Sequence, residues 1–257
     1  MTLHPSLPVK RPRVIFTDVD DTVAPSTHAL DATMATALMA LHDSGIQLVF
    51  VSGAAMPQML VQVSPQLPRP HVLLGTSGSH AVAMDAGPHG LVQRELFHKG
   101  FDQRERADIL EALKALVKHF DIKPDTTEAD QLQDRGCQFT LSALGHAAND
   151  ARKRAYDPDG SRRREWVGFL ADKLGAGRFS LRVGGTTSID ITAPGVDKGW
   201  GVRELLKLQG WKAEDCLYFG DRFEETGNDY PVLAVLDCVA VKHPAETLKH
   251  FQALLAR

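Results

Sequence analysis

Three aspartates follow one short apolar segment near the beginning of the chain. Residues 14–17 form a β-branched and aromatic run that is typical of a buried strand, and this run ends in Asp18, Asp20 and Asp21. Two carboxylates one residue apart after a strand can divide the work on a phosphoryl group, because one can attack phosphorus while the other moves protons. The spacing of Asp18 and Asp20 therefore favours phosphoryl transfer.

Further polar residues suited to this reaction stand at predicted strand ends or helix starts, namely Ser52, Lys198, Asp221 and Asp229. In open α/β sheets ligands bind outside the carboxyl ends of the strands, so we expect these side chains to meet there. Mg²⁺ is the cation that suits a site of carboxylates and a phosphate, because it prefers oxygen ligands and retains water. A lysine and a hydroxyl would complete the neutralisation of the phosphoryl oxygens.

The elements that must position these residues alternate between strand and helix. After the first strand, residues 27–44 have helical spacing, residues 46–51 form an apolar run, and a further helix over residues 56–63 leads to a strand at 71–74. The same rhythm resumes from Lys198. This order predicts an α/β fold with a Rossmann-like, doubly wound parallel sheet.

A different pattern interrupts the sheet. Residues 104–119 predict a long amphipathic helix and the charged stretch 152–174 is also predicted to be helical, with short alternating segments around them. Such a mixed stretch is typical of an inserted α+β domain. We expect a discontinuous catalytic core over residues 1–84 and 188–257, and a cap over residues 85–187 that selects the substrate.

Composition excludes several classes of protein. The net charge of −3 gives no general attraction to nucleic acid. No apolar run is long enough to cross a bilayer, and residues 1–13 lack the apolar centre of a signal peptide, so we expect a soluble, cytoplasmic protein without a membrane partner. The one basic run, residues 162–164, is interpreted as a solvated helix face.

Taken in order, these residues resemble the haloacid dehalogenase phosphatases. The counterparts of the four family motifs are Asp18-Val19-Asp20-Asp21-Thr22 for DxDxT, Ser52 for the second motif, Lys198 for the third, and Gly220-Asp221 with Asn228-Asp229 for the fourth. The resemblance narrows toward eukaryotic-type phosphomannomutases and the sugar phosphatases that share their cap. Residues 220–229 have the longer spacing of the fourth motif in those mutases, and residues 184–190 followed by 195–198 look like their strand that returns from the cap.

The resemblance implies a role for each motif residue. Asp18 is expected to attack phosphorus and form a phospho-enzyme, while Asp20 acts first as acid and then as base. Mg²⁺ is expected to be held by a carboxylate oxygen of Asp18, the main-chain carbonyl of Asp20 and Asp221, with Asp229 orienting metal-bound water. Lys198 and Ser52 would bind the phosphoryl oxygens.

In the cap, the family resemblance implies that Arg135, Ser188 and Asp190 hold the sugar and its far phosphate. The expected partner is a small phosphorylated metabolite, and the expected function is Mg²⁺-dependent hydrolysis of a phosphorylated sugar or polyol. A phosphohexose mutase is the alternative, and a non-catalytic phosphometabolite-binding protein is the alternative of another class. The cap is also the candidate surface for a homodimer.

Some positions depart from the family pattern. Asp21 stands where glycine is usual, Ser77 where asparagine precedes Gly78, and His146 where the mutases have a second phosphate-binding arginine. The loss of that arginine removes a permanent charge and a bidentate fork, which favours hydrolysis. Lys153 or the basic run 162–164 could compensate for it.

Overall fold

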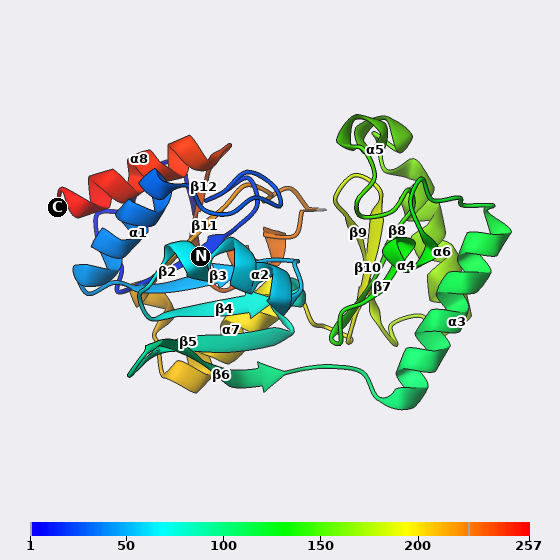
Figure 1. Ribbon diagram of the computed structural model, residues 1–257, viewed down its shortest axis with the longest axis horizontal. Helices are drawn as coiled ribbons and strands as arrows, with labels where there is room; N and C mark the ends of the chain where they lie inside the picture. The colour runs from blue at the N-terminus through cyan, green and yellow to red at the C-terminus, as the bar shows by residue number, and fades with distance from the viewer. Residues whose placement is uncertain (1, 226) are drawn as a thin grey trace. The chain divides into compact units, whose positions relative to one another are not determined.

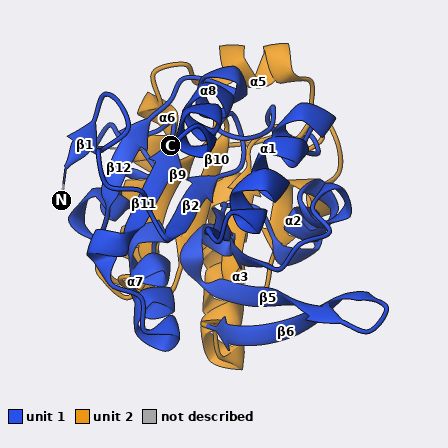
Figure 2. Ribbon diagram, turned by 90° about the vertical axis from the view of Figure 1, so that its left-hand side faces the viewer, with its two compact units in different colours: residues 1–98, 197–257 blue, residues 99–196 orange. Residues whose placement is uncertain are grey.

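The computed structural model describes residues 2–225 and 227–257. Their contacts divide the chain into two compact units, one of residues 1–98 with 197–257 and the other of residues 99–196 (Figure 2). The first is the discontinuous unit that carries the strand-end aspartates.

The discontinuous unit is built on an eight-stranded sheet (Figure 1). In spatial order its strands are β1 (Leu3–His4), β12 (Asp237–Ala240), β11 (Cys216–Gly220), β2 (Val14–Asp18), β3 (Gln47–Val51), β4 (His71–Gly75), β5 (His80–Gly87) and β6 (Gly90–His98). The neighbours from β1 to β4 pair in parallel, whereas β5 and β6 pair antiparallel. The predicted doubly wound α/β sheet is therefore confirmed, with an antiparallel extension at one edge.

Helices cover both faces of this sheet. The helical segments of the unit are α1 (Ala32–Asp43), α2 (Met56–Gln62), α7 (Lys198–Gln209) and α8 (Pro244–Leu255), with short 3₁₀ turns η1 (Ser64–Gln66), η2 (Thr76–Gly78), η3 (Ala213–Asp215) and η4 (Tyr230–Ala234). Alternation along β2 divides its side chains between two cores. Ile15 packs with α1, α2 and α8, whereas Val14 and Phe16 pack with α7 on the other face.

The contiguous unit is a four-stranded antiparallel sheet with helices on one face. Its strands, in spatial order, are β7 (Leu132–Asp134), β8 (Gln138–Ser142), β10 (Ser188–Thr192) and β9 (Ser180–Gly184), and its helices are α3 (Gln103–His119), α4 (Glu128–Gln131), α5 (Asp150–Tyr156) and α6 (Ser161–Leu174). Phe139, Leu141, Ile189 and Ile191 pack in one core with α3 and α6. Period-two alternation leaves Thr140, Ser188 and Asp190 on the opposite, polar face.

The compact units differ in their boundaries from the expected domains. The boundaries fall at 98/99 and 196/197 rather than at 84/85 and 187/188, because β6 pairs with β5 in the first sheet and β10 pairs with β8 and β9 in the second. The charged stretch 152–174, predicted to be helical, contains parts of two helices. It is interrupted between α5 and α6, where Pro158 cannot continue a helix and Gly160 adopts a left-handed φ of 71°.

Among the described residues, no helix is both long and apolar enough to span a bilayer.

Candidate active site

The ammonium of Lys198 lies between two carboxylates at the end of β2. Its Nζ donates to Oδ1 of Asp18 at 2.6 Å and to Oδ1 of Asp229 at 2.8 Å. Burial alone would lower the pKa of Lys198, but the two carboxylates outweigh that effect and raise its pKa. The lysine, 1% exposed, is therefore charged and held by two partners.

The beginning of α7 positions this lysine. The side chain of Asp197 accepts a hydrogen bond from the backbone N–H of Trp200 at 2.8 Å and so caps the helix. Lys198 is the first helical residue. A Cβ on Gly199 would lie only 2.4 Å from the carbonyl oxygen of Pro231. The first turn of α7 is consequently packed against η4 without space for a side chain.

A turn after β4 supports the same helix start from another side. Thr76, Ser77 and Gly78 are consecutive left-handed residues, with φ of 47°, 55° and 93°. A Cβ on Gly78 would lie 2.5 Å from the carbonyl oxygen of Asp197, and one on Gly201 would lie 2.4 Å from the carbonyl oxygen of Gly78. The left-handed backbone explains why asparagine suits position 77 in the resembling family, and Ser77 adopts the same conformation.

Asp229 is held by donors on both oxygens. Besides Lys198, the hydroxyl of Tyr218 donates to Oδ1 at 2.5 Å, and the backbone N–H of Arg222 donates to Oδ2 at 3.1 Å. Burial and the neighbouring carboxylate raise the pKa of Tyr218, which keeps the phenol protonated as a donor. Sequence reasoning missed Tyr218; a tyrosine within the otherwise apolar strand β11 was the available signal.

Three carboxylates gather at this edge. Oxygens of Asp18, Asp221 and Asp229 lie within 4.8 Å of one another. Burial raises the pKa of Asp18 well above its usual range, although Lys198 acts in the opposite direction. Burial, followed by repulsion from Asp229, raises the pKa of Asp221 to about 6. The three carboxylates offer only oxygen donors, and one ammonium does not neutralise their charge. Oxygen donors with excess negative charge fit a hard divalent cation.

Asp20 lies on the loop that follows β2. Its Oδ1 accepts a hydrogen bond from the backbone N–H of Thr27 at 2.7 Å. Asp21 is exposed, adopts a left-handed φ of 57°, and accepts a hydrogen bond from the backbone N–H of Ser26. A left-handed backbone favours glycine, and aspartate tolerates that conformation. The extra carboxylate is directed to the loop, although its charge still contributes to the raised pKa of Asp221.

Ser52 follows β3, which lies beside β2, since Asp18 is paired with Val51 in the ladder. The side chain is buried, and its Oγ accepts a hydrogen bond from the backbone N–H of Ala54 at 3.0 Å. Its own N–H donates to the carbonyl of Leu74. The hydroxyl is therefore fixed at the carboxyl edge of the parallel strands, where the sequence predicts it.

The three predicted cap residues belong to the other unit. Ser188 and Asp190 lie two residues apart on β10 and so share a face of the sheet. Asp190 accepts a hydrogen bond from Thr140 Oγ1 at 2.8 Å, and the charge of Arg135 acts on it. The guanidinium of Arg135 donates to Gln133 Oε1 at 3.1 and 2.7 Å. Arg135 and Asp190 thus belong to one polar network on this sheet face.

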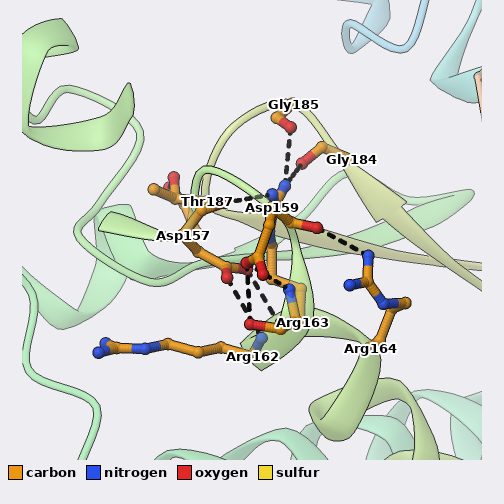
Figure 3. A network of polar contacts seen from close by, with 10 residues as sticks. Asp157, Asp159, Arg162, Arg163, Arg164, Gly184, Gly185 and Thr187 are labelled. Carbon is orange, nitrogen blue, oxygen red and sulfur yellow. Dashed lines mark hydrogen bonds and ion pairs between the residues drawn. The ribbon is translucent and has the colours of Figure 1, made fainter. Parts of the chain in front are cut away.

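Arg162 and Arg164 are exposed, as a solvated helix face requires, but that interpretation is wrong for the central residue of the basic run, Arg163 (Figure 3). Arg163 is 5% exposed and donates to Oδ2 of Asp157 at 2.7 Å. It also donates to the carbonyls of Gly184 at 3.0 Å and Gly185 at 2.7 Å. A buried guanidinium with this many acceptors is a clamp that holds the β9–β10 turn to α6.

Three comparisons with known proteins agree with this geometry. A family model described as haloacid dehalogenase-like hydrolase matches residues 169–252. A phosphomannomutase of Spinacia oleracea is 27% identical over 123 residues, which are 46% of this chain and 48% of that protein, so the match spans about half of the relative's length.

Solved structures share the fold. The IMP-bound, N-terminally truncated IMP-nucleotidase of Plasmodium falciparum has a TM-score of 0.67 at 15% identity, covering 95% of this chain and 68% of that one. A haloacid dehalogenase-like hydrolase from Bacteroides thetaiotaomicron has a TM-score of 0.66 at 12% identity, covering 94% and 98%.

The parallel sheet, the ordered carboxylates and the buried lysine belong to one unit, and residues 169–252 are similar to the haloacid dehalogenase-like hydrolases. The fold is the one seen in the two solved structures above. Over nearly half of its length the chain is also similar to a phosphomannomutase.

Proposed function

We propose that this protein is a Mg²⁺-dependent phosphatase that hydrolyses a small phosphorylated sugar or polyol through an aspartyl-phosphate on Asp18. The observation that carries the proposal is Lys198 buried between Asp18 and Asp229, with Asp221 beside them. A structural lysine would need one counterion. A lysine among three carboxylates is suited instead to a site that also admits a cation and an anionic substrate.

Each residue of this site has a role in the proposed reaction. Asp18 forms a bond from a carboxylate oxygen to phosphorus as the bond from phosphorus to the sugar oxygen breaks, and Asp20 supplies the proton to that oxygen. Asp20 then takes a proton from water, whose oxygen attacks phosphorus and releases Asp18. Lys198 and the Ser52 hydroxyl bind phosphoryl oxygens in both steps.

Magnesium would be held by the carboxylates of Asp18 and Asp221 and the main-chain carbonyl of Asp20, with Asp229 supporting the site through its position beside Lys198. The cation would neutralise phosphate charge and help align the reacting groups. Asp229 is suited to an orienting role because both of its oxygens already accept hydrogen bonds from the protein.

The proposed substrate follows from the cap unit. Arg135, Ser188 and Asp190 share a polar sheet face, and a face that carries both donors and acceptors is suited to a hydroxyl-rich group. The similarity to a phosphomannomutase supports a sugar phosphate. In this proposal the cap selects the substrate and excludes water until the phospho-enzyme has formed.

Hydrolysis is favoured over a mutase reaction because three of the four cations that could replace the missing arginine hydrogen-bond within the protein, while the fourth, Arg162, lies over the ring of Tyr156. Lys153 Nζ donates to the carbonyl of His146 at 2.6 Å, and Arg163 is bound to Asp157. Arg164 donates to the carbonyl of Asp159 at 2.8 Å. These contacts leave the basic run poorly suited to bind a second phosphate.

Phosphate release from a panel of phosphorylated sugars and polyols, measured with Mg²⁺ and with excess chelator, tests the proposal. We expect release that requires Mg²⁺ and is abolished in Asp18→Asn, which keeps the shape of the side chain but removes the attacking charge. Conversion of a sugar 1-phosphate into its 6-phosphate without phosphate release, activated by a hexose bisphosphate, would instead identify a mutase. Binding without turnover would identify a non-catalytic protein.

A further inference from the structure

We infer that Gln62 is a positioning residue that fixes the carboxylate of Asp20 for proton transfer. The inference rests on the proposed function, in which Asp20 is the acid and base. Gln62 is the last residue of α2 and lies 42 positions beyond Asp20 in the sequence, outside every motif discussed above.

The side chain of Gln62 connects α2 to the loop that carries Asp20. Its Nε2 lies 3.3 Å from Oδ1 of Asp20 and 3.3 Å from the carbonyl oxygen of His28. The backbone carbonyl of Gln62 accepts a hydrogen bond from the N–H of Leu30 at 3.0 Å. Loop and helix are thus joined by a backbone bond, which any residue at position 62 would make, and by an amide donor that is particular to glutamine.

Packing gives no reason for an amide at this position. Gln62 is 3% exposed, and its neighbours Met59 and Val63 are fully buried apolar side chains. Among the residues that the structure describes, the buried Oε1 of Gln62 has no hydrogen-bond partner. An unsatisfied buried polar atom costs about 1–3 kcal/mol, so methionine would fill the site at lower cost. The bond that Nε2 donates is what distinguishes glutamine here.

That bond decides which oxygen of Asp20 is available. Oδ1 is the acceptor for both Gln62 Nε2 and the backbone N–H of Thr27. Within the described part of the chain, Oδ2 has no donor. We assign to Oδ2 the proton that passes to the departing sugar oxygen and the proton later taken from water. With Oδ1 held, the carboxylate cannot turn away between the two steps.

Gln62→Met tests this assignment, and Gln58→Met is the matched control because it makes the same change one turn earlier on α2. Both variants are compared with the wild type and again in an Asp20→Asn background. We expect Gln62→Met to lower kcat about tenfold, equivalent to ~1.4 kcal/mol of transition-state stabilisation, while KM changes less than about twofold. In the Asp20→Asn background the same change should have no further effect, because Gln62 acts through Asp20.

A second measurement does not depend on turnover. The Thr27 amide is held by Asp20, so its hydrogen exchange should be at least about fivefold faster in Gln62→Met and unchanged in Gln58→Met. Gln62→Glu is a further variant of the same shape in which the donor is replaced by a carboxylate oxygen, and it should show the same faster exchange. Unchanged exchange at Thr27 would overturn the inference even if the wild type has no phosphatase activity. A wild-type kcat in Gln62→Met, or an equal loss in both backgrounds, would overturn it while leaving the proposed function standing.

Discussion

At Lys198, a single ammonium is surrounded by more negative charge than it can neutralise. Asp18 and Asp229 are in contact with it, and Asp221 completes a cluster of three carboxylates. Burial increases the free-energy cost of that excess, which is why the pKa of Asp18 and the pKa of Asp221 are both raised. The site is consequently arranged for a cation, and its charge balance depends on pH when none is bound.

Asp221 should therefore make the cation-free protein less stable as the pH rises. Its pKa is about 6 in the folded protein against an ordinary value of 3.8, so its contribution to stability is fully present below about pH 4 and is lost as the pH rises through about 6. In excess chelator, the Tm of the wild type should fall between about pH 5 and pH 7.5 more steeply than that of Asp221→Asn.

Thermal unfolding of both proteins across this pH range provides the measurement. Added Mg²⁺ should raise the Tm of the wild type at the upper end of the range, because a ligand that binds the folded state stabilises it. The effect on Asp221→Asn should be much smaller. Parallel Tm profiles for the two proteins in chelator would exclude Asp221 as the group responsible.

At the level of secondary-structure elements, the position of Lys198 depends on a contact between the turn after β4 and the beginning of α7. Substitutions at Gly78 and Gly45 can be compared to distinguish the effect of losing this contact from the effect of backbone strain. Their φ angles are nearly equal, at 93° and 91°, but a Cβ on Gly78 would meet the carbonyl of Asp197 whereas one on Gly45 would meet nothing within 4 Å.

Gly45→Ala should lower the free energy of unfolding by about 1–2 kcal/mol, the cost of a left-handed alanine, and leave kcat unchanged. Gly78→Ala should cost more than that and should lower kcat as well, because the beginning of α7 must move and carries Lys198 with it. Urea unfolding and steady-state kinetics of the two variants provide the comparison. Equal losses of stability with unchanged kcat in both would show that the contact does not position the lysine.

The clamp around Arg163 makes a second prediction about an element. Arg163→Met leaves the buried carboxylate of Asp157 without its partner and should lower the free energy of unfolding by about 3–5 kcal/mol. Arg164→Met removes an exposed arginine from the same turn of the helix and should change the free energy of unfolding by less than about 0.5 kcal/mol. Urea denaturation followed by tryptophan fluorescence measures both, since Trp166 lies in the core of this unit. A similarly small change in the free energy of unfolding for both variants would mean that the contacts of Arg163 do not hold the β9–β10 turn.

The contrast between these residues also shows what a sequence can predict. Asp18 and Ser52 could be placed because each directly follows a strand whose apolar run is continuous, and the edge of a parallel sheet brings such residues together. Gln62 and Tyr218 could not, because their roles depend on which carboxylate the tertiary packing brings to them. Arg163 was misplaced for the same reason, since charge in a helix pattern indicates solvent unless a buried partner is known.

The boundaries of the compact units differ from those expected for the cap, for a related physical reason. Period-two alternation at residues 188–192 identifies a strand but not the sheet it joins, since both sheets accept the same pattern. The β5–β6 hairpin likewise has short alternating segments that suit either unit. Only the hydrogen-bonded register with β4 assigns it to the catalytic sheet.

At the level of the whole molecule, the cap unit should determine which phosphate esters are hydrolysed efficiently. Arg135→Ala should lower kcat/KM for the preferred sugar or polyol phosphate by about tenfold, the scale of a lost charged hydrogen bond. Hydrolysis of para-nitrophenyl phosphate, which lacks a hydroxyl-rich group for the cap to bind, should remain nearly unchanged. The ratio of the two kcat/KM values is the measurement, and equal losses on both substrates would contradict a selective role for Arg135.

The strand order has a consequence for how this protein is made. Strand β2 ends in Asp18 and lies between β3 and β11, yet residues 216–220 leave the ribosome about two hundred residues after it. Until then, one hydrogen-bonding edge of β2 is open, and an open apolar edge can pair with another chain. By contrast, residues 99–196 are contiguous and can pack earlier. Lys198, Asp221 and Asp229 are also synthesised late, so a nascent or prematurely terminated chain carries Asp18 without the groups that surround it. During translation the catalytic sheet is therefore the part that most needs protection by chaperones.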